Sequence, residues 1–101
     1  MSENRRLILF SRVGEFMCSV EVLSQEENII SGRLIENQMS ESILNLFKEY
    51  EELVNNVVFS MLDELEDQID KLGFYAIESD LKYNIHQLQI MNETDIAFKI
   101  L

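Results

Sequence analysis

The sequence has no proline, only three glycines and no segment rich in glycine and serine. Such segments form the linkers between domains, and no stretch of the chain repeats at the spacing of a solenoid. The length of 101 residues is close to the commonest size of one domain. We therefore predict a single domain over residues 1–101.

Cysteine is almost absent as well, since Cys18 is the only one. A single thiol cannot form an internal disulfide, and small secreted domains usually depend on disulfides, so the sequence favours a reducing compartment. The first apolar run, Leu7–Phe10, is far shorter than the core of a signal peptide or a membrane span. We expect a cytoplasmic protein with no membrane segment.

Basic residues are scarce: eight Lys and Arg stand against 19 Asp and Glu, for a net charge of −11. A surface of this sign repels phosphate backbones, so direct binding to nucleic acid is not expected. A basic protein, by contrast, would be attracted at long range. The apolar fraction of 47% is too high for a disordered acidic tail, so the chain should fold.

Catalytic groups are few. His86 is the only histidine, and no serine, cysteine or carboxylate stands near it at a catalytic spacing. Cys18 has apolar neighbours at two-residue spacing, which predicts a buried and unreactive thiol. The glycines are isolated, so no phosphate-binding loop is present. We expect a non-enzymatic protein without a cofactor; an enzyme would have to use His86, Tyr83 and the carboxylates between Asp63 and Asp70.

Both ends of the chain carry the pattern of strands. Three alternating or apolar runs lie in the N-terminal third, with a turn at Gly14–Glu15, and their short connections imply antiparallel pairing. Two or three more runs follow near the C-terminus, the last two forming a hairpin. A switch of apolar parity near His86–Gln87 predicts a β-bulge there. The predicted strands are 7–10, 16–22, 29–35, 74–77, 83–91 and 96–101.

Between the strands, apolar residues recur every three or four positions from Ser40 to Leu72, as in an amphipathic helix. Ser40 or Asn37 could cap its start and Gly73 could end it. One helix of this length would measure roughly 50 Å, against a radius of gyration of about 13 Å for a compact domain. Either the helix breaks near Asn55–Asn56, or it overhangs the sheet and a second copy covers it.

The apolar stripe runs on through Val57 and Val58, which favours the unbroken helix and therefore a homodimer. The predicted fold is α+β. It is an antiparallel sheet of three N-terminal strands, one long central helix and two or three C-terminal strands, with the helix packed on one face. In this arrangement Val57 is buried.

The acids concentrate on the helical segment, where residues 40–72 hold nine acidic and two basic residues. Asp63, Glu66, Asp67 and Asp70 lie on one side over two turns, opposite the apolar positions. The segment lacks the glycine turn of a calcium loop and the Glu-x-x-His pattern of bundle di-metal sites, so no metal is expected.

Two interpretations of this acidic face remain. It could simply keep the protein in solution, or it could be a docking face for a basic protein. We predict a non-enzymatic protein-interaction domain that binds a basic partner through Asp63, Glu66, Asp67 and Asp70. Immunity proteins and antitoxins that neutralise a basic toxin, and chaperone-like binders, belong to this class. The alternative is a structural homodimeric subunit of a larger complex.

Overall fold

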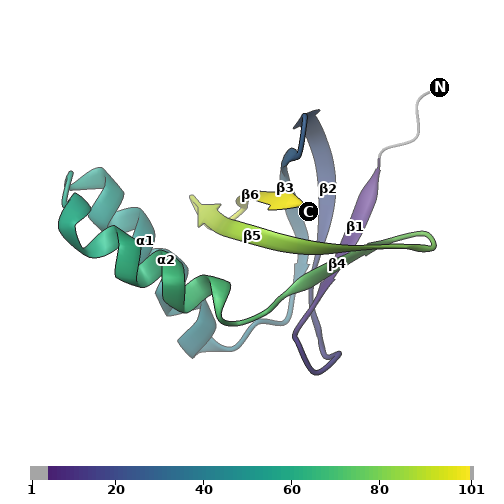
Figure 1. Cartoon of the computed structure of the whole chain (residues 1–101), viewed down its shortest axis with the longest axis horizontal. Helices are drawn as coiled ribbons and strands as arrows, with labels where there is room; N and C mark the ends of the chain where they lie inside the picture. Colours follow the sequence, from purple (N-terminus) through teal and green to yellow (C-terminus); the bar gives the residue numbers. More distant parts are fainter. Residues whose placement is uncertain (1–4, 101) are drawn as a thin grey trace.

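The computed structural model describes residues 5–100, which form six strands, two α-helices and one 3₁₀ helix (Figure 1). In chain order they are β1 (Arg6–Phe10), β2 (Phe16–Glu26), β3 (Ile29–Asn37), α1 (Glu41–Asn55), η1 (Phe59–Met61), α2 (Leu62–Asp70), β4 (Tyr75–Glu78), β5 (Leu81–Met91) and β6 (Asp95–Ile100).

The six strands close into an antiparallel barrel in the order β1-β2-β3-β6-β5-β4. The ring is completed where β4 returns to β1, with Ile8 opposite Ile77 and Leu9 opposite Ala76. The strand residues that point into the barrel are fully or almost fully buried. They include Leu7, Leu9, Val20, Ile30 and Phe98.

The predicted architecture, an α+β fold with an open sheet and one long helix on one face, is therefore wrong. Within residues 5–100 each predicted strand overlaps an observed one, although β2 runs four residues further than predicted, and three strands follow the helices. The predicted strand end at Leu101 lies outside the described residues. What differs is their pairing: β3 pairs with β6 and β1 with β4, so the sheet curls into a ring. Closure gives each strand within residues 5–100 a neighbour on both sides, whereas an open sheet would have left two edge strands.

The predicted continuous helix is also wrong, because α1 ends at Asn55. The break lies beside Asn55–Asn56, the point that the sequence marks as weakest. Val57 adopts a left-handed backbone with φ of 56°. The amide of Val57 donates to the carbonyl of Val54 at 3.1 Å, and the amide of Val58 donates to that of Leu53 at 2.9 Å. This pair of bonds is the Schellman motif, which normally places glycine at the left-handed position.

After this turn, η1 and α2 run back along α1, so that the two helices form a hairpin beside the barrel (Figure 1). Both helices contact β5, and their apolar faces join the interior of the barrel in one core. The radius of gyration is 13.3 Å. A second copy is therefore not needed to cover an overhanging helix, and the argument for a homodimer loses its premise; the oligomeric state stays a prediction.

The predicted bulge in the fifth strand is confirmed. The pairing of β5 with β6 shifts register between His86 and Gln89, and Gln87 has a positive φ of 52°. A bulge of this kind bends a strand and increases its twist, which a small barrel requires. Gly32 serves the barrel differently: a Cβ there would lie 2.3 Å from the carbonyl oxygen of Glu21, so β2 and β3 could not approach as they do.

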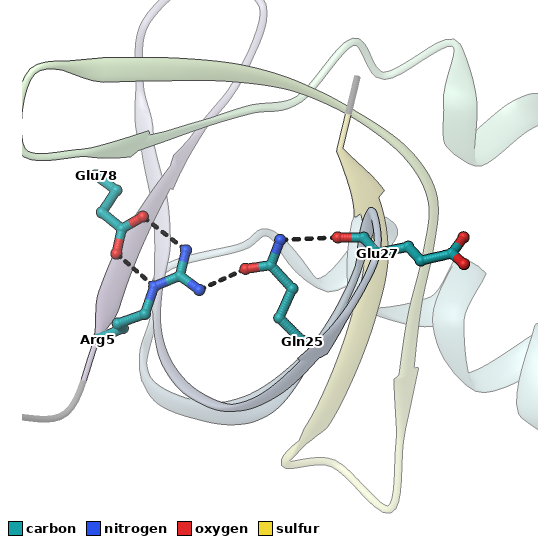
Figure 2. A network of polar contacts seen from close by, with 4 residues as sticks. All are labelled: Arg5, Gln25, Glu27 and Glu78. Carbon is teal, nitrogen blue, oxygen red and sulfur yellow. Dashed lines mark hydrogen bonds and ion pairs between the residues drawn. The ribbon is translucent and has the colours of Figure 1, made fainter.

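A polar network ties the segment before β1 to two other strands (Figure 2). Nε and Nη2 of Arg5 donate to the two carboxylate oxygens of Glu78 at 2.8 Å each. Nη1 of Arg5 donates to Oε1 of Gln25, whose Nε2 donates to the carbonyl of Glu27 at 2.9 Å. The hydrogen bonds and charge of the guanidinium lower the pKa of Glu78. The network therefore links β2 to the end of β4 across β1.

Candidate interaction surface

The helix α2 is amphipathic, with Leu62, Leu65 and Ile69 buried against the core. The acids of the same helix occupy its other positions. Two of them, Asp63 and Glu64, lie in the first turn, where the positive end of the helix dipole stabilises negative charge. The four acids predicted to bind a partner lie on this helix. They have different environments.

Glu66 is half-buried and holds the helices together. The hydroxyl of Tyr50 on α1 donates to Oε1 of Glu66 at 3.3 Å, and Nε2 of Gln89 on β5 donates to the Tyr50 oxygen at 3.3 Å. Burial, together with the charge and hydrogen bond of Glu66, raises the pKa of Tyr50. The Glu66 carboxylate therefore serves an internal contact that spans β5, α1 and α2.

Asp70 supports the bulge of β5. Its Oδ1 accepts a hydrogen bond of 3.0 Å from the backbone amide of Gln87. Gln87 lies where the register shifts, and its amide therefore needs a partner outside the regular ladder. The carboxylate supplies that partner, so Asp70 contributes to the fold as well as to the charge of the surface.

Asp63 and Asp67 are exposed, as is Glu64 between them. Asp67 has a weak ion pair at 4.0 Å with Lys71, and both side chains are more than 70% exposed. Pairs of this kind contribute little to stability. These three residues, Asp63, Glu64 and Asp67, form the outer acids of α2, and they are free to meet a partner.

The sequence interpretation missed an apolar patch at the far end of the hairpin. Val57, Phe59 and Met61 are 66%, 61% and 50% exposed, although the helical pattern predicted that Val57 is buried. We call these three residues the tip patch. A signal was present in the sequence: Asn55–Asn56, two poor helix formers, are followed by the β-branched pair Val57–Val58.

The groups considered for catalysis have different environments. Cys18 is completely buried inside the barrel, as predicted, and burial raises the pKa of its thiol to about 12. His86 is exposed on β5 and Tyr83 is half-buried on the same strand. Within residues 5–100, no three or more His, Cys, Asp or Glu side chains are grouped so that they could hold a metal ion.

Comparison with known proteins adds no relative: the chain matches no family model, no curated protein and no solved structure. In the part of the chain from Arg5 to Ile100, no helix has the length and apolar character needed to cross a membrane. The outer acids of α2 follow the exposed tip patch closely in the chain.

Proposed function

We propose that this domain is a non-enzymatic binding protein for a basic protein partner, and that it docks through the helical hairpin. The observation that carries the proposal is the separation of roles on α2. Its apolar residues and Glu66 face the fold, while the outer acids are exposed and make at most one weak ion pair. Immunity-like or chaperone-like binding of a basic protein in the cytoplasm fits this surface.

Electrostatics supports the proposal at longer range. The net charge of −11 creates a field that accelerates encounter with a cationic protein. Moderate salt screens the attraction between exposed charges that are more than about 10 Å apart, while closer charges still attract each other. A partner that comes near the hairpin would therefore be oriented toward the helices by their acids. Association should therefore be fast at low salt and slower as salt is added.

A structural homodimer remains the second candidate, and the tip patch is the observation that favours it. Three exposed apolar side chains within five positions could meet the same patch of a second copy. Two copies would each bring a net charge of −11, and this repulsion opposes self-association. Sedimentation of the isolated protein at low and high salt decides between monomer and dimer.

The test of the proposed function begins with affinity capture and identification of the partner by mass spectrometry. Association of the purified pair is then followed by stopped-flow fluorescence at several salt concentrations. The triple variant Asp63→Lys, Glu64→Lys and Asp67→Lys should fold normally, since these side chains are exposed. It should associate more slowly, with the largest loss at low salt.

A matched control reverses three exposed acids on the barrel, by Glu15→Lys, Glu26→Lys and Glu36→Lys. Both triple variants have the same net charge. A larger effect of the hairpin variant supports docking there. If the two variants slow association equally, only net charge matters; if neither does, the acids serve solubility, and the homodimer becomes the better explanation.

A further inference from the structure

The turn between α1 and α2 lies at the end of the hairpin that is farthest from the barrel (Figure 1), and the residues of the tip patch belong to this turn and to η1. Other exposed apolar side chains of residues 5–100 are spread over the barrel strands and their turns. At the tip, by contrast, three exposed apolar residues lie within five positions, in the turn after α1 and in η1. Exposed apolar side chains that are grouped in this way are typical of a surface that binds another molecule.

A cleft between α1 and α2 extends this patch. It has a volume of about 110 Å³ and is lined by Glu49, Leu53, Met61, Glu64, Leu65 and Gln68. Met61 thus belongs to both the cleft and the tip patch. The cleft is open to solvent, and its apolar residues Leu53, Met61 and Leu65 could be covered by an aliphatic side chain of a partner.

Carboxylates surround the apolar groups. Glu49 and Glu64 line the cleft, and Glu52 and Asp63 are further exposed acids of the same two helices. An uncharged apolar partner would remove water from these carboxylates without replacing its hydrogen bonds, at a cost of several kcal/mol for each buried charge. Lysine or arginine beside the apolar contact would compensate that loss. The surface therefore requires a partner that is both apolar and basic.

The shape favours a helix as that partner. Two antiparallel helices present a groove into which the side-chain ridge of a third helix can pack. The tip is also preorganised, because the hydrogen bonds of Val57 and Val58 to α1 fix the turn. A fixed turn reduces the conformational entropy lost on binding.

We propose that the tip patch and the cleft between α1 and α2 bind the apolar face of a basic amphipathic helix in the partner protein. This proposal rests on the proposed function and specifies the partner's docking element. One apolar side chain of that helix enters the cleft beside Met61, while its lysine or arginine side chains meet Glu49 and Glu64. Docking would complete a three-helix arrangement at the end of the hairpin.

The test uses the full chain and two fluorescein-labelled synthetic peptides of leucine and lysine. One peptide has its leucines on a single helical face, and the other has the same composition with its leucines distributed around the helix. Fluorescence anisotropy at physiological salt should show tighter binding of the amphipathic peptide. The variant Phe59→Ser with Met61→Ser should weaken its binding by at least about tenfold.

The matched control is Leu23→Ser with Leu81→Ser, two exposed apolar residues of the barrel strands, and it should leave binding unchanged. If the serine variants of the tip do not fold, amide NMR signals of the unmodified protein replace them. The amphipathic peptide should shift signals of residues 49–68 and leave those of β1–β3 in place.

Equal binding of the two peptides, or equal loss in the tip and barrel variants, would overturn this inference. The proposed function would still stand if the Asp63, Glu64 and Asp67 reversals slowed association with the captured partner. A dimer in the unmodified protein that the tip variant converts to a monomer would assign the tip to self-association and would likewise overturn the inference.

Discussion

Val57 is a β-branched residue with a left-handed backbone, a conformation that glycine adopts without steric cost. Its side chain is exposed, so little packing is lost when it is removed. Val57→Gly should therefore raise the free energy of unfolding by about 1 kcal/mol, measured by urea denaturation. Val57→Asp should be close to neutral, which reverses the expectation from the helical pattern.

Val13→Gly is the matched control for this prediction. Val13 is 76% exposed in the turn between β1 and β2 and is not among the residues with positive φ. Glycine there only increases the entropy of the unfolded chain, so stability should fall by about 0.4–1 kcal/mol. If the two glycine variants change stability in the same direction, Val57 is not strained.

Cys18 offers a second test at the scale of one residue. Its side chain is fully buried and the pKa of its thiol is raised to about 12, so very little thiolate is present at neutral pH. Labelling by a thiol reagent should be slow in the native protein and fast after unfolding in urea. Because there is no other cysteine, the reaction reports on this site alone. Equal rates would show that the interior of the barrel is open to the reagent.

The sequence predicted these two residues with different success for a physical reason. Cys18 lies in a strand whose apolar residues alternate, and alternation directly specifies which side chains face inward. Val57 lies in a helical pattern that stays in phase on both sides of the break. A helix end is usually marked by glycine, and here valine holds the left-handed position, so the usual signal is absent.

At the scale of elements, the contacts of α2 separate acids that support the fold from acids that are free. Asp70→Ala removes the acceptor for the backbone amide of Gln87 and should lower the free energy of unfolding by about 1 kcal/mol. Asp67→Ala removes only a weak ion pair between exposed side chains and should change stability little. Thermal denaturation of the two variants in one buffer tests the distinction. Equal midpoints would mean that Asp70 does not stabilise the bulge.

The pairing of strands was the part of the fold that the sequence could not supply. Hairpins such as β5–β6 follow from short connections and were predicted correctly. The pairings of β1 with β4 and of β3 with β6 join segments separated by much of the chain, and no local pattern records them. The same limit applies to the candidate site. Helical spacing predicts that the acids of α2 are exposed, but it cannot predict the contacts of Glu66 and Asp70, because their partners lie on α1 and β5.

At the scale of the whole molecule, the Arg5–Glu78 pair predicts how stability depends on pH. Hydrogen bonding to Arg5 lowers the pKa of Glu78 from its ordinary value of 4.5. The pair therefore stabilises the fold above about pH 4.5, and this contribution is lost as the pH falls through the lower pKa of the folded state. Glu78→Gln should reduce stability at neutral pH by at most about 1 kcal/mol, since the Arg5 side chain is 39% exposed.

The measurement compares the urea midpoints of Glu78→Gln and the unmodified protein from neutral pH to about pH 3. Their difference should shrink at low pH. Repeating the substitution in an Arg5→Ala background isolates the pair, and there the effect of Glu78→Gln should be smaller at neutral pH. If Glu78→Gln lowers the urea midpoint by the same amount with and without Arg5, the effect of Glu78 comes from another contact.

The closure of the ring between β1 and β4 also determines how the chain reaches its native state. β1 is synthesised before the helical hairpin, and Ile8 and Leu9 can meet Ile77 and Ala76 only after that hairpin and β4 have been made. A sheet of β1, β2 and β3 formed before that point would have two open edges, and open edges are prone to pair with other chains. Contacts between segments that are far apart in the sequence form slowly, because the entropy of closing a long loop is lost before the contacts are made. Repulsion between chains that each carry a net charge of −11 opposes such pairing, so the charge would protect the protein most before the ring closes.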